Sequence, residues 1–295
     1  MTAAGVLWVN GVITPAAEAT VPALDRGLLY GDGVFETIRA YAAAPFRLRD
    51  HLERLADDCR ALSIPLGMGS EDLRVAVVET LSHAGAGDTY VRLTVTRGVG
   101  GLPSELDQCR QATVMIHARP FAGYPAELYR RGMAAAVSTV RRNETSALCG
   151  VKSLNYLDNI LAKAQAQQRG FAEALMLNGR GVVAEACAAN LFVVRDGRLA
   201  TPPVVDGCLP GITRGVVMEL SQVDETSLLL QDVRQAEEAF LTNSLMEIMP
   251  LVSVDSDAVG DGHPGPITRQ LCAAYRSLVE QECRGHTSEE GAAAR

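Results

Sequence analysis

The spacing of apolar residues changes repeatedly along the chain, and this feature limits the possible folds most strongly. Residues 90–96 alternate apolar and polar side chains, as a half-buried strand does. Residues 49–62 instead repeat their apolar side chains every three or four positions, which is the period of an amphipathic helix. The chain therefore mixes strands and helices.

Turn signals and the same two periods place the remaining elements. Asn178-Gly179 and Asp196-Gly197 each stand between apolar runs, which is the strongest short signal for a hairpin. They predict a three-stranded meander over residues 174–199. The other elements expected are a hairpin at 7–13, strands at 35–41, 113–118, 134–140 and 240–242, and helices at 71–84, 155–169, 211–222 and 267–283.

The helix expected at 155–169 follows Lys152 closely. Asn155 is a residue type that commonly caps helices, and Gly170 is a typical stop. One apolar face of this helix consists of Leu157, Ile160, Leu161 and Ala164.

An irregular stretch divides the chain. Residues 118–132 contain two prolines and two glycines, which predicts an interdomain loop at 118–127. We therefore expect a small N-terminal domain at 1–117 and a larger C-terminal domain at 128–285. The small and polar residues of 286–295 predict a disordered tail.

Charge and cysteine usage exclude several classes of protein. The chain of 295 residues carries a formal net charge of -8 at pH 7, which argues against nucleic-acid or anionic-membrane partners. No apolar stretch is long enough to span a bilayer, and residues 1–12 lack a signal sequence, so we expect a cytoplasmic protein. The seven cysteines include no CxxC pair, which favours reduced thiols over disulfides or a metal site.

Lys152 is the first candidate for chemistry. Most lysines are solvated surface residues, but Lys152 has the apolar neighbours Val151 and Leu154. Apolar surroundings lower the pKa of a lysine amine, which a lysine that forms a Schiff base requires.

Two other charged residues each allow two interpretations. Glu185 lies inside the apolar run 182–194, where a carboxylate is costly unless it has a partner. It is either one half of an internal ion pair or the partner of a protonated pyridine nitrogen. Arg54 is either a surface residue of the helix at 49–62 or a bidentate phosphate clamp.

Two loops are candidates for an anion site. Gly211 directly precedes a predicted helix, so the backbone N–H groups of Ile212 and Thr213 lie at a helix start, where phosphate binds well. Residues 242–244 follow a predicted strand. They form either a polar turn or, through the hydroxyl of Ser244, a second phosphate contact.

Together these segments resemble the class IV aminotransferase family, enzymes of fold type IV that use pyridoxal 5'-phosphate (PLP). The resemblance covers almost the whole chain, through DRGLLYGDGVFETIR, HLERL, VKSLNYL, EACAANLF, LPGITR and TNSLMEIMPL. It implies an α+β (mixed α/β) fold, with a small N-terminal α/β domain and a larger C-terminal, PLP-binding domain that has a barrel-like sheet. It also implies a homodimer, with the active site between the domains and completed by the partner chain.

The resemblance assigns roles to single residues of this chain. Lys152 resembles the lysine that holds PLP as a Schiff base and moves the proton, and Glu185 resembles the carboxylate on the pyridine nitrogen. Tyr156 resembles a tyrosine that some members place near the 3'-oxygen of PLP. The positions that resemble the phosphate contacts are Arg54, the amides of Ile212 and Thr213, and the hydroxyl of Ser244.

The residues around the cofactor do not separate the reactions of this family. FETIR, EACAANLF and TNSLMEIMP look most like aminodeoxychorismate lyases, which form 4-aminobenzoate and pyruvate, so the lyase is the first hypothesis. VKSLNYL and YVRLTVTRGVG look like archaeal-type branched-chain enzymes, although Thr37 and TNSLME replace the usual glycine and GTAAE turn. The alternative is therefore an aminotransferase for branched-chain L-amino acids or D-amino acids with a 2-oxo acid acceptor. The possible partners of a substrate carboxylate are Arg26, Arg39, Arg92 and Arg97.

Overall fold

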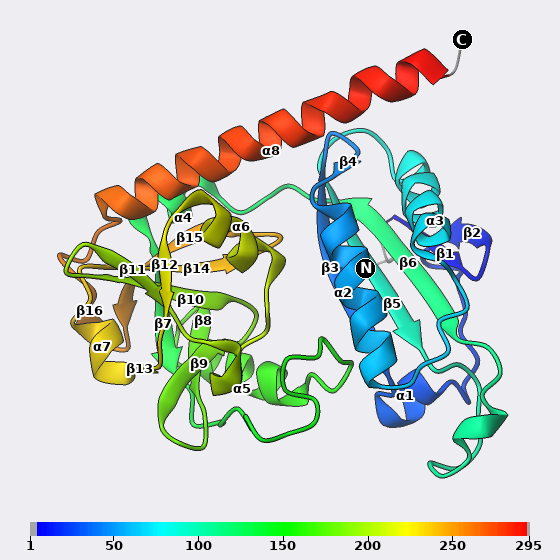
Figure 1. Ribbon diagram of the computed structural model, residues 1–295, viewed down its shortest axis with the longest axis horizontal. Helices are drawn as coiled ribbons and strands as arrows, with labels where there is room; N and C mark the ends of the chain where they lie inside the picture. Colours follow the sequence, from blue (N-terminus) through cyan, green and yellow to red (C-terminus); the bar gives the residue numbers. More distant parts are fainter. Residues whose placement is uncertain (1–4, 294–295) are drawn as a thin grey trace. The chain divides into compact units, whose positions relative to one another are not determined.

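The computed structural model describes residues 5–293, which fold into two compact units (Figure 1). Unit 1 comprises the chain up to Gly123, the short segment Val151–Asn155 and the chain from Val279 onward. Unit 2 comprises Tyr124–Gly150 and Tyr156–Leu278. The chain passes from unit 1 to unit 2 inside the loop predicted at 118–127. The local sequence does not show that the two later segments belong to unit 1, because contacts between distant parts of the chain decide this.

Unit 1 contains a six-stranded antiparallel sheet in the order β2-β1-β6-β5-β3-β4. Its strands are β1 (Val6–Val9), β2 (Val12–Pro15), β3 (Gly33–Tyr41), β4 (Ala44–Pro45), β5 (Thr89–Thr96) and β6 (Thr113–Pro120). Helices α2 (Leu48–Ala61) and α3 (Ser70–His83) pack on one face of this sheet. Alternate residues of β5, such as Leu93, form the core with α2 residues such as Leu55, as the two periods predict.

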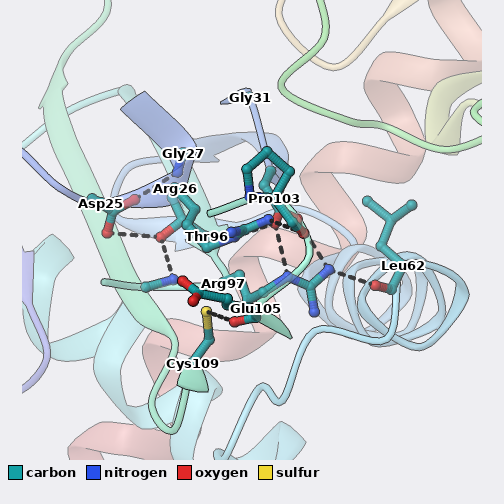
Figure 2. A network of polar contacts seen from close by, with 12 residues as sticks. Asp25, Arg26, Gly27, Gly31, Leu62, Thr96, Arg97, Pro103, Glu105 and Cys109 are labelled. Carbon is teal, nitrogen blue, oxygen red and sulfur yellow. Dashed lines mark hydrogen bonds and ion pairs between the residues drawn. The ribbon is translucent and has the colours of Figure 1, made fainter. Parts of the chain in front are cut away.

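A buried carboxylate fastens the short helix α1 (Arg26–Tyr30) to the sheet of unit 1 (Figure 2). Asp25 caps α1 by accepting the N–H of Gly27 at 2.8 Å. It also accepts the hydroxyls of Thr96 on β5 at 2.9 Å and Thr113 on β6 at 2.7 Å. After β5 the chain forms the short 3₁₀ turn η1 (Leu106–Gln108).

Unit 2 contains a ten-stranded mixed sheet in the order β12-β11-β10-β14-β15-β7-β8-β9-β13, with β16 paired to β15. The strands are β7 (Met133–Val137), β8 (Glu173–Leu177), β9 (Val182–Ala186), β10 (Asn190–Arg195), β11 (Arg198–Thr201), β12 (Val223–Glu225), β13 (Leu228–Leu229), β14 (Glu238–Asn243), β15 (Glu247–Val254) and β16 (Asp257–Ala258). A bridge between Ala186 and Ala189 joins β9 to β10 across a short turn. The strands β10, β14, β15, β7, β8 and β9 pair in this order within the sheet. The bridge brings the first and the last of these six strands together, which bends this part of the sheet toward a barrel. The expected α+β fold with two sheets is confirmed.

The three-stranded meander predicted at 174–199 is wrong in its pairing. Strands β8 and β9 pair as expected, and β10 and β11 form a hairpin in which Asp196 and Gly197 both have positive φ. The long edge of β10, however, pairs with β14, from a part of the chain about fifty residues later. Local turn signals indicate hairpins, but they do not indicate which distant strand covers the remaining edge.

The helices of unit 2 are α4 (Ala126–Arg131), α5 (Leu157–Gln168), α6 (Ile212–Leu220), α7 (Leu230–Arg234) and the first part of α8 (Pro266–Ala293), with the 3₁₀ turn η2 (Val204–Asp206). The disordered tail predicted from residue 286 is wrong as far as Ala293, because α8 continues to that residue. Extending an existing helix adds one hydrogen bond per residue, and Glu and Ala propagate helices well. Residues 294–295 lie outside the described part of the chain. None of the helices within residues 5–293 is both long and apolar enough to cross a bilayer.

Helix α5 differs from its prediction at its start and in its buried face. It begins at Leu157, and the predicted cap Asn155 instead donates to the carbonyl of Gly31 at 3.0 Å within unit 1. The buried side of α5 consists of Asn159, Ala162 and Ala166. The predicted apolar face points to solvent, since Leu157, Ile160 and Leu161 are 71%, 54% and 53% exposed.

Candidate active site

Lys152 lies in the segment of unit 1 that runs beside β3. Its carbonyl accepts the N–H of Phe35 at 2.9 Å, and the N–H of Leu154 donates to the carbonyl of Gly33 at 2.9 Å. The N–H of Lys152 donates to Oδ2 of Asp58 on α2 at 3.0 Å. The amine Nζ stands 4.4 Å from the centroid of the Phe35 ring. The amine therefore lies beside an aromatic ring, and the backbone of Lys152 is tied to two elements.

Arg54 on α2 is a partly buried, paired cation. Its Nε and Nη2 donate to the two carboxylate oxygens of Glu36, each at 2.7 Å. Oε2 of Glu36 also lies 2.7 Å from Nδ1 of the buried His51. Burial raises the pKa of Glu36, but Arg54 and His51 lower it further, and the pKa falls to about 2 from its ordinary 4.5. The interpretation of Arg54 as a solvated surface residue is therefore wrong.

The sequence contains a signal for these two partners of Glu36, although none of the predicted site roles involves Glu36 or His51. Glu36 alternates with Val34 and Ile38 on the apolar face of β3, where an unpaired carboxylate would be costly. His51 and Arg54 are three residues apart, so they lie on one side of α2. A buried carboxylate opposite a His/Arg pair is readable from these two spacings.

Glu185 lies in β9 and is 5% exposed. Its Oε1 is 3.2 Å from Nη2 of Arg142, and its Oε2 accepts the N–H of Leu209 at 3.0 Å. Asn190 approaches the same oxygen at 3.5 Å through Nδ2. The carboxylate of Glu185 is therefore held by contacts from three other residues. The sequence does not identify Arg142 as the partner of Glu185, because Arg142 lies in an irregular segment that has no helical or strand periodicity.

Helix α6 begins at Ile212, as predicted, with Gly211 at its N-cap position. Glycine has no side chain to cap the helix, so the first N–H groups, including those of Ile212 and Thr213, lack a side-chain partner from that position. A Cβ on Gly211 would lie 2.1 Å from Oδ1 of Asn190, so a larger residue there would require the Asn190 side chain to move. The helix start is thus held against β10 with its N–H groups uncapped.

Tyr156 and Ser244 lie near the same short segment of unit 2. The hydroxyl of Tyr156 donates to the carbonyl of Cys187 at 2.9 Å, and burial raises the pKa of Tyr156 well above its ordinary value. Ser244 stands in the turn between β14 and β15. Its neighbour Asn243 donates to the carbonyl of Ala188 at 2.8 Å. Residues 185–190 therefore connect this turn with Glu185 and the start of α6.

The predicted site residues form two sets, one in each unit. Lys152 and Arg54 belong to unit 1, where both act electrostatically on the carboxylate of Asp58. The set in unit 2 consists of Glu185, Tyr156, Ile212, Thr213 and Ser244.

Three of the four arginines considered for a substrate carboxylate are already paired with a carboxylate, and two of these three share Asp32. Nε of Arg26 and Nε of Arg97 each donate to Oδ2 of Asp32 at 2.8 Å. Arg26 also donates to the carbonyl of Leu102 at 2.9 Å. Figure 2 shows Arg97 beside Leu62, to whose carbonyl it donates at 2.8 Å. Both side chains are buried and serve to fix loops.

The other two arginines differ from each other. Arg39 donates to Asp88 at 2.7 Å. The guanidinium carbon of Arg92 lies 3.9 Å from the centroid of the Phe35 ring, the ring that also contacts the Lys152 amine. Arg92 forms no ion pair with any side chain that the structure describes, which are those of residues 5–283. Of the four arginines, Arg92 is therefore the one without a carboxylate partner among the described side chains.

Two sheets with this combination of a lysine amine, a buried carboxylate and an uncapped helix start are typical of fold type IV PLP enzymes. Residues 33–254 match the family described as "Amino-transferase class IV". The chain therefore belongs to the class IV aminotransferase family.

Three similar proteins carry one activity in their names. A Methanocaldococcus jannaschii protein named "Putative branched-chain-amino-acid aminotransferase" is 39% identical over 278 residues, which is 92% of this chain and 96% of that protein. The structure of a branched-chain amino acid aminotransferase from T.th. with pyridoxamine 5'-phosphate has a TM-score of 0.90 and 31% identity, with 96% of each chain covered. The Thermoproteus uzoniensis branched-chain aminotransferase with norvaline has a TM-score of 0.86 and 35% identity, covering 95% of this chain and 96% of that one.

These relatives reverse the order of the two hypotheses drawn from the sequence. They give no support to the aminodeoxychorismate lyase, and they support the branched-chain aminotransferase alternative. The segments that favour the lyase, such as FETIR and TNSLMEIMP, adjoin the residues that resemble cofactor contacts. Both activities need those contacts, so differences in these segments carry little information about the substrate.

Proposed function

We propose that this chain is a PLP-dependent branched-chain amino-acid aminotransferase. It would transfer the amino group of L-Leu, L-Ile or L-Val to a 2-oxo acid such as 2-oxoglutarate. The observation that carries the proposal is the similarity of more than nine-tenths of the chain to enzymes of this name, with Lys152 and Glu185 in place.

The residues present fit PLP in charge and in shape. Gly211 leaves the start of α6 uncapped and close to β10, which suits a phosphate group. Glu185 is a buried carboxylate beside Arg142 and suits a protonated ring nitrogen. When bound, PLP supplies a ring that accepts the electron pair left at the substrate Cα.

The roles of the residues follow from this fit. Nζ of Lys152 would hold the cofactor and then take the proton from the substrate Cα. Glu185 would hold a proton on the ring nitrogen, and Tyr156 would lie near the 3'-oxygen. The phosphate would be bound by Arg54, the N–H groups of Ile212 and Thr213, and the hydroxyl of Ser244.

We also propose that the protein is a cytoplasmic homodimer. Leu157, Ile160 and Leu161 expose an apolar stripe on α5 that a second copy of the chain would cover. Light scattering should give twice the chain mass of 31.4 kDa. A monomer at micromolar concentration would contradict the dimer.

The reaction is tested with three kinds of amino donor. With PLP and 2-oxoglutarate, L-Leu, L-Ile and L-Val should each yield L-glutamate and the matching 2-oxo acid, and D-Ala should yield none. Aminodeoxychorismate is the control for the lyase hypothesis. Formation of 4-aminobenzoate and pyruvate, without reaction of the three L-amino acids, would contradict the proposal and restore the lyase.

Arg54→Lys tests the phosphate contact. Lysine keeps a positive charge near the buried Glu36 but loses the two-pronged geometry of the guanidinium. A charged hydrogen bond contributes roughly 1.5–3 kcal/mol, so the Kd for PLP should rise by about ten-fold or more. Titration of the apoenzyme with PLP measures this, with the exposed Arg49→Lys on the same helix as the control. Equal affinity in both variants would leave Arg54 a structural partner of Glu36.

A further inference from the structure

The backbone of Lys152 is held from two directions. On one side, β3 binds the segment through the carbonyl of Lys152 and the N–H of Leu154, each at 2.9 Å. On the other side, α2 binds it through Asp58, whose Oδ2 accepts the N–H of Lys152 at 3.0 Å. The first two bonds join backbone to backbone, whereas the third comes from an acidic side chain. The position of the Lys152 backbone therefore depends in part on a carboxylate.

Asp58 is an unusual residue for its position. It is 6% exposed and lies within α2, where aspartate is a weak helix former. Among the described side chains, those of residues 5–283, it has no ion-pair partner. Burying a carboxylate without a counter-ion is costly, and neither the helix nor the core of unit 1 requires a charge there. The bond to Lys152 is what the carboxylate supplies.

We propose that Asp58 is a positioning residue, which fixes the backbone of Lys152 so that the amine stays over the ring of Phe35. The proposal rests on the proposed function, in which Lys152 carries the reactive amine. Nζ of Lys152 lies 4.4 Å from the centroid of the Phe35 ring, and the N–H of Phe35 donates to the carbonyl of Lys152. Loss of the Asp58 bond would free one end of this arrangement and spread the amine over more positions.

The charge of Asp58 changes near neutral pH. Burial raises its pKa to about 6 from the ordinary 3.8, while the N–H of Lys152 and the cation of Arg54 oppose this rise. The other groups that act on it are Glu36, which raises the pKa, and the Lys152 amine, which lowers it. A carboxylate accepts a hydrogen bond more strongly than its neutral acid. The backbone of Lys152 should therefore be held more firmly above pH 6 than below it.

The direct test is the amide signal of Lys152 in the ¹⁵N-labelled apoenzyme, followed from about pH 4.5 to pH 8. The signal should shift with a midpoint near pH 6, the pKa of Asp58. Asp58→Asn should remove this midpoint, because the carboxamide does not titrate. Asp57→Asn, at the exposed neighbouring position, should keep it. A midpoint near pH 6 that persists in Asp58→Asn would overturn the proposal.

Kinetics separate positioning from a purely structural role. Asp58→Ala should lower kcat by roughly ten-fold, the scale of one charge-assisted hydrogen bond, with the KM for L-Leu nearly unchanged. Asp58→Asn should recover most of the loss at pH 8, because its carboxamide oxygen still accepts the N–H of Lys152. An unchanged kcat in Asp58→Ala would overturn the proposal. Should Asp58→Ala fail to fold, the amide titration of Asp58→Asn still decides it.

Replacement of Asp58 should lower kcat, but it should raise the thermal stability of the apoenzyme. Because the pKa of Asp58 is raised on folding, its ionised form destabilises the folded state above pH 6, and this penalty fades as the pH falls toward 3.8. Asp58→Asn should therefore raise Tm at pH 8, with a smaller gain at pH 5. A lower Tm of Asp58→Asn at pH 8 would show that Asp58 stabilises the fold as a structural residue, and it would overturn the proposal. Failure of the proposed function shows separately: the amide of Lys152 still titrates in the apoenzyme, but PLP added to the same protein does not attach to Lys152.

Discussion

Lys152→Arg should abolish transamination while leaving unit 1 folded. Arginine keeps the positive charge and much of the length of the side chain, but its guanidinium does not act as a nucleophilic amine or as a base near pH 7. A positioned proton-transfer group alone contributes up to about 10⁴-fold. Since Lys152 would both hold the cofactor and move the proton, the loss in turnover with L-Leu should be roughly 10⁴-fold or more.

The composition of the chain makes this experiment unusually clean. Lys152 and Lys163 are its only two lysines, and Lys163 forms an ion pair with Glu173 at 3.0 Å. Borohydride treatment with PLP should leave the label on the peptide that contains Lys152. Lys163→Arg is the matched control and should keep both the label and the activity. A label on Lys163, or equal turnover in Lys152→Arg and the parent, would refute the assignment.

Glu185→Gln should reduce turnover by on the order of 10²-fold or more, the scale of other preorganised electrostatic contacts in active sites. Glutamine keeps the shape of the side chain and can still accept the N–H of Leu209. It removes the negative charge that would hold a proton on the ring nitrogen. PLP should remain bound, and the ¹⁵N chemical shift of ring-labelled cofactor should move toward that of an unprotonated pyridine.

Loss of the ion pair with Arg142 must be separated from loss of that charge. Glu144 is a second carboxylate of unit 2 paired with an arginine, Arg180. Glu144→Gln is therefore the matched control, and its turnover and ring-nitrogen shift should stay near those of the parent. A fully active Glu185→Gln with an unchanged ring-nitrogen shift would reduce Glu185 to the internal ion pair that the sequence also allows.

Local patterns in the sequence were sufficient for elements whose structure depends on neighbours along the chain. The spacing of Leu52 and Leu55 predicts α2, and Gly211 predicts the start of α6 within one residue. The same patterns place Arg54 and Glu185 on a helix and a strand. They do so because helical and strand periods are local properties of the backbone.

What the sequence does not predict depends on contacts between distant segments. The partners of Arg54 and Glu185, namely Glu36 and Arg142, come from other elements. An amphipathic period also identifies an apolar face without saying what covers it. On α5 that face, with Ile160 54% exposed, is turned away from the core of its own unit. The sequence therefore shows which residues are apolar or charged, but it does not show which distant segments they contact.

The division of unit 1 into three separate segments has a consequence for the order of events during synthesis. Proteins are made from the N-terminus, and domains commonly fold as they emerge. Residues up to Gly123 leave the ribosome first, but the strand-like segment with Lys152 follows only after the stretch Tyr124–Gly150 of unit 2, and the last segment starts at Val279. The hydrogen bond from Phe35 to Lys152 therefore joins parts of the chain that are made far apart in time. Nascent unit 1 thus lacks its lysine amine until unit 2 has begun to appear, and it is completed only after Leu278 of unit 2 has been made.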